Sequence, residues 1–74
     1  MPVPQETRDR VFDFALAWRK AELRLAIIIY RQTTGEVPHD PVTRQAAQET
    51  LDDCERALRI VLDEAREEEE KDDG

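Results

Sequence analysis

Cysteine, histidine and glycine are scarce in this chain, and each shortage excludes a class of protein. Cys54 is the single cysteine, so no disulfide forms within the chain. His39 is the single histidine, and the cysteine and histidine sets that bind structural zinc are therefore missing. Glycine-rich phosphate loops, helical metal motifs and serine or cysteine triads are also absent. We therefore expect no metal, no cofactor and no catalytic activity.

Long apolar runs are missing as well. The longest extends from Leu25 to Tyr30 between two arginines, whereas a helix that crosses a bilayer needs about 20 apolar residues. The first residues lack the basic start and apolar run of a signal peptide. We expect a cytoplasmic protein with no membrane contact. A chain of 74 residues builds a core that contributes only about 3–5 kcal/mol of net stability, so oligomerisation is the remaining stabilising device.

Negative charge is concentrated at the C-terminal end. Residues 67–74 carry six acids and one base, a net charge of −5 out of the −7 of the whole chain. Four consecutive glutamates near the end of a helix oppose the helix dipole and repel one another. We therefore predict that the second helix ends near Arg66 and that residues 67–74 form a disordered acidic tail.

Helical periodicity covers most of residues 1–66. The pattern predicts one helix over about residues 5–34, a turn at 35–40 and a second helix over about residues 41–66. Gly35 is placed to end the first helix, and Pro38 prevents its continuation. Asp40 followed by Pro41 is a helix start signal. A connection this short predicts an all-α, antiparallel two-helix hairpin.

The second predicted helix has one apolar stripe, whereas the first has two. The stripe of the second helix has the alternating four-three spacing of a coiled-coil seam. Its main members are Leu51, Cys54, Leu58 and Val61. On the first helix, one apolar face contains Val11, Phe14, Trp18, Leu25, Ile28 and Ile29, with Glu22 among them. The other face contains Phe12, Leu16, Leu23, Ile27 and Tyr30.

One stripe can cover only one of these two faces, and a helix that is apolar on both sides must be buried on both. The pattern leaves open which face meets the second helix. We assign the Phe12 face to the seam within the hairpin and the Val11 face, with Glu22, to the interface with a partner. Covering a second face contributes on the order of 10 kcal/mol before the costs of association.

The simplest partner is a second copy, and two hairpins would form a four-helix bundle with both first helices in its centre. The sequence thus predicts a protein–protein interaction module without catalytic activity, such as an adaptor, scaffold or regulator. The alternative is an obligate subunit of a hetero-complex, in the manner of an antitoxin, chaperone or inhibitor.

Two polar features could carry other functions. Glu22 follows Arg19 by three residues, which favours an ion pair, within the helix or between subunits, over acid–base chemistry. Lys20, Arg24 and Arg31 form a basic strip that could contact nucleic acid or an acidic partner. The interleaved Asp13 and the negative net charge favour a solvated strip, and nucleic-acid regulation is the weakest of the alternatives.

Overall fold

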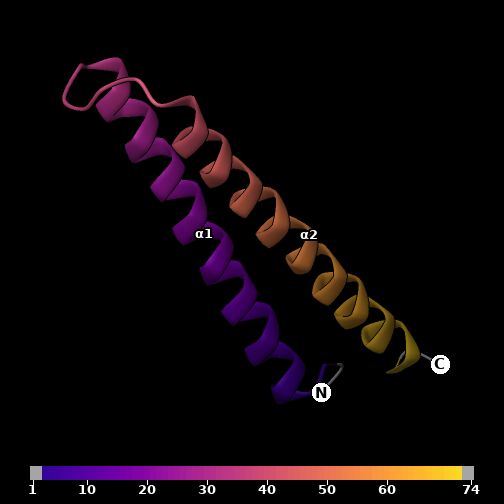
Figure 1. Ribbon diagram of the computed structural model, residues 1–74. Helices are drawn as coiled ribbons and strands as arrows, with labels where there is room; N and C mark the ends of the chain where they lie inside the picture. Colours follow the sequence, from indigo (N-terminus) through magenta and orange to yellow (C-terminus); the bar gives the residue numbers. More distant parts are fainter. Residues whose placement is uncertain (1–2, 73–74) are drawn as a thin grey trace.

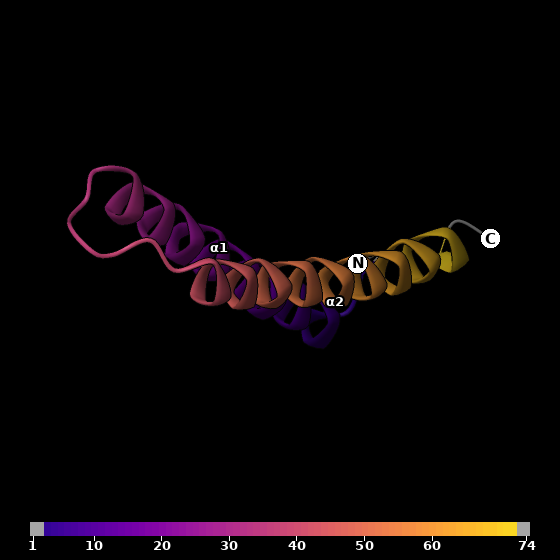
Figure 2. The same ribbon diagram turned by 45° about the horizontal axis from the view of Figure 1, so that its top comes forward.

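The chain folds as two long antiparallel helices joined by one loop (Figure 1). This computed structural model describes the backbone of residues 3–72 and the side chains of residues 3–70. Helix α1 comprises Gln5–Thr33 and helix α2 comprises Pro41–Asp72. The hairpin measures 56 × 15 × 14 Å, and a second view shows that the two helices cross (Figure 2). Residues 3–72 contain no strand, and the all-helical hairpin predicted from the sequence is confirmed.

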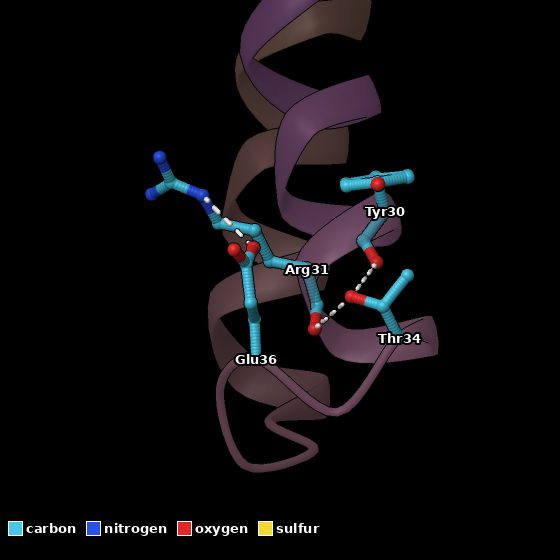
Figure 3. A network of polar contacts seen from close by, with 4 residues as sticks. All are labelled: Tyr30, Arg31, Thr34 and Glu36. Atoms are coloured by element: carbon cyan, nitrogen blue, oxygen red, sulfur yellow. Dashed lines mark hydrogen bonds and ion pairs between the residues drawn. The ribbon is translucent and has the colours of Figure 1, made fainter.

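Glycine ends α1 in the predicted way. Gly35 adopts a φ of +78°, which is left-handed backbone that residues with a Cβ rarely adopt. The Thr34 hydroxyl donates to the carbonyl oxygens of Tyr30 at 3.0 Å and Arg31 at 3.3 Å (Figure 3). The Val37 amide donates to the carbonyl of Arg31 at 3.4 Å. These bonds satisfy carbonyl groups that the last turn of a helix leaves free.

Asp40 caps the start of α2. Its Oδ1 accepts hydrogen bonds from the amides of Val42 at 3.1 Å and Thr43 at 3.2 Å. Its Oδ2 accepts a hydrogen bond from the Thr43 hydroxyl. The side-chain and backbone hydrogen bonds from Thr43 hold the pKa of Asp40 below its ordinary value of 3.8, because they favour the ionised carboxylate.

Acid should therefore remove the stabilising effect of the Asp40 cap. Because the folded-state pKa is lowered, this stability is fully present above the unfolded-state pKa of about 3.9 and is lost as the pH falls through the folded-state value. Thermal unfolding followed by circular dichroism should show Asp40→Ala less stable than the wild type at neutral pH. Asp40→Asn keeps a capping oxygen and should lose less. If the wild type remained more stable than Asp40→Asn by the same amount in acid, the lowered pKa of Asp40 would be contradicted.

Helix α2 continues beyond the predicted end. The predicted end near Arg66 is wrong, because α2 remains helical as far as Asp72. The prediction of a disordered tail is therefore wrong for residues 67–72. The antiparallel fold places these turns beside the first turns of α1 (Figure 1). The Thr7 hydroxyl donates to Glu68 at 2.8 Å, and Arg10 forms an ion pair with Glu64 at 3.3 Å. The positive end of the α1 dipole also faces this acidic run, which compensates the repulsion between its glutamates. Residues 73–74 lie outside the described residues.

The core is a single seam between the helices. Ala21 and Leu25 of α1 and Val61 of α2 are its buried hydrophobic residues, and Thr7 is buried beside Glu68. Half-buried side chains extend the seam along both helices. They are Val11, Phe14, Trp18, Ile28, Ile29 and Gln32 on α1, and Ala47, Leu51, Cys54, Ala57, Leu58 and Ala65 on α2. The predicted stripe of α2 thus faces α1.

The structure reverses the assignment of the two α1 faces. The residues assigned to a partner interface, Val11, Phe14, Trp18, Leu25, Ile28 and Ile29, pack within the hairpin, with Glu22 half-buried at their edge. The α1 residues assigned to the seam, Phe12, Leu16, Leu23, Ile27 and Tyr30, are exposed. The face that packs on α2 is the one whose helical spacing is unbroken. The Val11 face alternates steps of four and three from Thr7 to Gln32 without a gap, whereas Arg19 and Lys20 interrupt the Phe12 face.

Two leucines on opposite faces of α1 provide a matched test. Leu25 is 8% exposed and Leu23 is 47% exposed. Leu25→Ala should cost about 2–5 kcal/mol and remove most of the stability of so small a core. Leu23→Ala should change the stability of the isolated hairpin by about 0.5 kcal/mol or less. Urea unfolding in dilute solution measures both values, and equal losses would contradict the observed orientation of α1.

Candidate protein interface

The exposed apolar face of α1 is the most distinctive surface of the hairpin. It consists of Phe12, Leu16, Leu23, Ile27 and Tyr30, and we call it the outer face. The exposed fractions of these side chains range from 43% at Leu16 to 66% at Phe12. At about 100° per residue, they lie on the side of α1 opposite the inner seam. Side chains of this size lined up along one face indicate a binding surface, because monomeric proteins rarely expose long apolar patches.

A polar pair divides the outer face near its middle. Arg19 and Lys20 are exposed and lie between Leu16 and Leu23. The Arg19 guanidinium forms an ion pair with Glu22 one turn further along the helix. Glu22 therefore has a partner within its own helix, which is one of the two pairings expected from the sequence. This pairing holds Arg19 at one edge of the outer face.

The predicted basic strip lies along the other edge. Lys20, Arg24 and Arg31 are all exposed there, and Arg31 forms an ion pair at 3.9 Å with Glu36 in the loop (Figure 3). The strip borders a shallow depression that is also lined by Leu23 and Ile27 of the outer face. The basic strip and the outer face are therefore parts of one continuous surface.

Acidic residues precede the basic strip along the same edge. Asp9 and Asp13 lie near the start of α1, and both are exposed. The edge is thus negative near the beginning of the helix and positive toward its end. From the sequence, Asp13 served only as an argument against nucleic acid, and this division into two blocks was not predicted. The order of the charged residues along the edge was the available signal.

Helix α2 exposes fewer large apolar residues. Val42 and Ile60 are exposed on one side of it, and Leu62 is exposed on another. They form no row comparable to the outer face. In the register set by the Arg10–Glu64 pair, Leu62 lies near the level of Phe12.

The other chemically notable groups are dispersed. Cys54 is half-buried in the seam, and His39 is exposed in the loop. Within the described part of the chain, no three histidine, cysteine, aspartate or glutamate side chains are grouped to hold a metal ion. A small pocket beside the loop is lined mainly by Ile28, Val37 and Pro38, and the Gln32 amide there donates to the Asp40 carbonyl at 3.1 Å. The outer face is therefore the best candidate for a functional surface.

Comparison with known proteins adds no family assignment. No family model, curated protein or solved structure matches the chain. In residues 3–72, neither helix has a stretch that is long and apolar enough to cross a membrane. The function must therefore be argued from the surface itself.

The basic strip should not bind nucleic acid by itself. Three cations neutralise few phosphates, and the chain as a whole carries a charge of −7. Titration of labelled DNA and RNA at about 0.15 M salt should show no saturable binding. Saturable binding that is weakened by both Arg24→Ala and Arg31→Ala would instead establish the strip as a nucleic-acid surface.

Proposed function

We propose that this protein is a protein–protein interaction module that assembles as a homodimer through the outer face of α1. In the dimer, two hairpins form a four-helix bundle with both α1 helices in the centre and both α2 helices outside. The observation that carries the proposal is the row of five large apolar side chains that α2 leaves exposed. The partner chain covers this row in place of water.

The apolar area of the outer face favours association. Full burial of a large apolar side chain contributes about 1.5–3 kcal/mol, and the side chains of the outer face are roughly half exposed already. Two copies of the face then contribute on the order of 10 kcal/mol. The loss of translational and rotational freedom opposes this by about 4–15 kcal/mol. The two terms are of similar size, so the outer face supports at most a dimer of moderate affinity.

A second copy is the simplest occupant of the outer face. A two-fold dimer uses the same patch on both subunits, so one row of apolar residues on α1 supplies both halves of the interface. The inner seam shows that this chain already packs two long helices side by side (Figure 1). Pairing α1 with its copy repeats that packing on the opposite side of the helix.

The proposed role is that of an adaptor, scaffold or regulator in the cytoplasm. In the bundle, the outer surface of α2 stays accessible, and it exposes Val42 and Ile60. These side chains offer a second contact for a further protein. The observation that favours a binding role is the apolar row itself, since its aliphatic and aromatic side chains suit contact with another protein.

Assembly should depend on the outer face and not on α2. Sedimentation equilibrium of the wild-type chain should give the mass of a dimer. Leu23→Asp should weaken the dimer by at least about 100-fold, because it replaces two interface leucines by two carboxylates that lose water on association, while circular dichroism shows that the hairpin stays helical. Ile60→Asp is the matched control on α2, and it should leave the dimer unchanged.

Three results would contradict the homodimer. A wild-type chain that stays folded and monomeric at high concentration would show that the outer face does not bind its own copy. An unchanged dimer in Leu23→Asp would place the interface elsewhere. A wild-type chain that is molten or aggregated alone, and folds only with a different protein, would favour the hetero-complex.

A further inference from the structure

A groove lies between the two helices on one flank of the hairpin, beside the loop, and we call it the loop-end groove. It consists of two adjoining cavities of about 370 and 280 Å³, which share Ile28 and Thr43. Its apolar lining is Ile28, Val37, Pro38, Val42, Ala46 and Ala47. We infer that this groove binds an amphipathic helix of a different protein, one with two acidic residues seven positions apart beside its apolar stripe.

Small side chains of α2 leave room for a third helix. Opposite Arg24 and Ile28 of α1, the α2 side of the groove consists of Val42, Thr43, Ala46, Ala47 and Thr50. Val42 is 76% exposed, so most of its apolar surface is uncovered. The groove extends over residues 21–32 of α1, which is about 16 Å at 1.5 Å per residue. A helix of about three turns matches this length, and its apolar side chains would fill the space above the alanines.

Two arginines give the groove its charge. Arg24 lines one cavity and Arg31 lines the other, and both side chains are exposed. They are seven residues apart, so they lie on the same side of α1 about 10 Å from each other along the helix axis. Among the described residues, Arg24 forms no ion pair. Two carboxylates with the same seven-residue spacing on a bound helix would pair with both arginines.

The loop already places one carboxylate at this rim. Glu36 forms the ion pair with Arg31 at 3.9 Å, and both side chains are more than half exposed (Figure 3). An exposed pair at this distance is weak, so a carboxylate of the partner helix can replace Glu36. The other acid that lines the groove, Asp40, is bonded to the amides of Val42 and Thr43 at the start of α2.

A second copy of the chain is a poorer occupant of the groove. The inner seam and the proposed dimer interface use the two apolar faces of α1. The acidic end of α2, residues 66–72, offers carboxylates but no apolar side chain. None of the residues that line the groove belongs to the outer face. The partner helix and the second copy can therefore be bound at the same time, and the inference does not depend on the homodimer.

Two fluorescein-labelled synthetic helices of about 18 residues test the charge requirement. They share a stripe of leucines and alanines and differ at two edge positions seven residues apart, where one has glutamates and the other lysines. Fluorescence anisotropy at about 0.15 M salt should show saturable binding of the glutamate peptide and at least about 10-fold weaker binding of the lysine peptide. The net charge of −7 repels the glutamate peptide, so a preference for it must come from local cations.

Variants of the groove locate the binding. Arg24→Glu and Arg31→Glu should each weaken binding of the glutamate peptide by about 5-fold or more, because each turns an attraction into a repulsion. Ala46→Gln should also weaken it, since the longer side chain fills the groove. Glu36→Gln should tighten it, because the competing carboxylate is removed. Arg44→Glu is the matched control: Arg44 is exposed, lines neither cavity and lies nearly opposite Ala46 around α2. Circular dichroism checks that every variant folds.

The experiment separates the groove from the dimer interface. Leu23→Asp should bind the glutamate peptide as tightly as the wild type does, because Leu23 lies outside the groove. A loss of binding in Leu23→Asp, with no loss in Ala46→Gln, would place the peptide on the outer face and overturn the inference. Equal affinity for the two peptides, no saturable binding of either, or equal losses in Arg24→Glu and Arg44→Glu would overturn it as well. Each of these results would leave the homodimer standing, since sedimentation tests that separately.

Discussion

The packing of α1 against α2 along one uninterrupted seam determines every other surface of this protein. The stripe of α2 is continuous from Ala47 to Ala65, so the face of α1 that covers it must be continuous as well. The face from Thr7 to Gln32 meets this condition, and Ala21 at its middle lets the helices approach closely. Once this face is used within the hairpin, the second apolar face of α1 has no cover from the residues that the structure describes, and the outer face results.

Local signals in the sequence were sufficient for the helices and the loop. Gly35 and Asp40 act through backbone groups within a few residues of themselves, so their roles follow from type and position alone. The choice between the two faces of α1 is not local. Both contain aromatic and branched residues, and the deciding members of the inner seam, Thr7 and Gln32, are polar residues that a search for apolar positions passes over. The unbroken alternation of four- and three-residue steps therefore predicts which face of α1 packs on α2 better than hydrophobicity does.

The acidic end of α2 is a second feature that local sequence signals do not determine. Taken alone, four glutamates at the end of a helix predict fraying, because they repel one another and the dipole. In the hairpin, this end lies beside the positive end of α1, and Thr7 and Arg10 bond to Glu68 and Glu64. Those contacts join residues that are more than fifty positions apart in the chain. A prediction that treats each helix separately cannot contain them.

The reversal of the two faces also changes what the charged residues do. If the Trp18 face were the interface, Lys20, Arg24 and Arg31 would lie far from it and would be a solvated strip. With Trp18 half-buried in the hairpin, the same cations border the surface that we propose as the partner interface. Charges at the rim of an apolar interface contribute little affinity but strongly affect which arrangement forms. In the proposed dimer, the outer face therefore supplies the strength of association, whereas the charged residues along its edge contribute to the choice of partner surface.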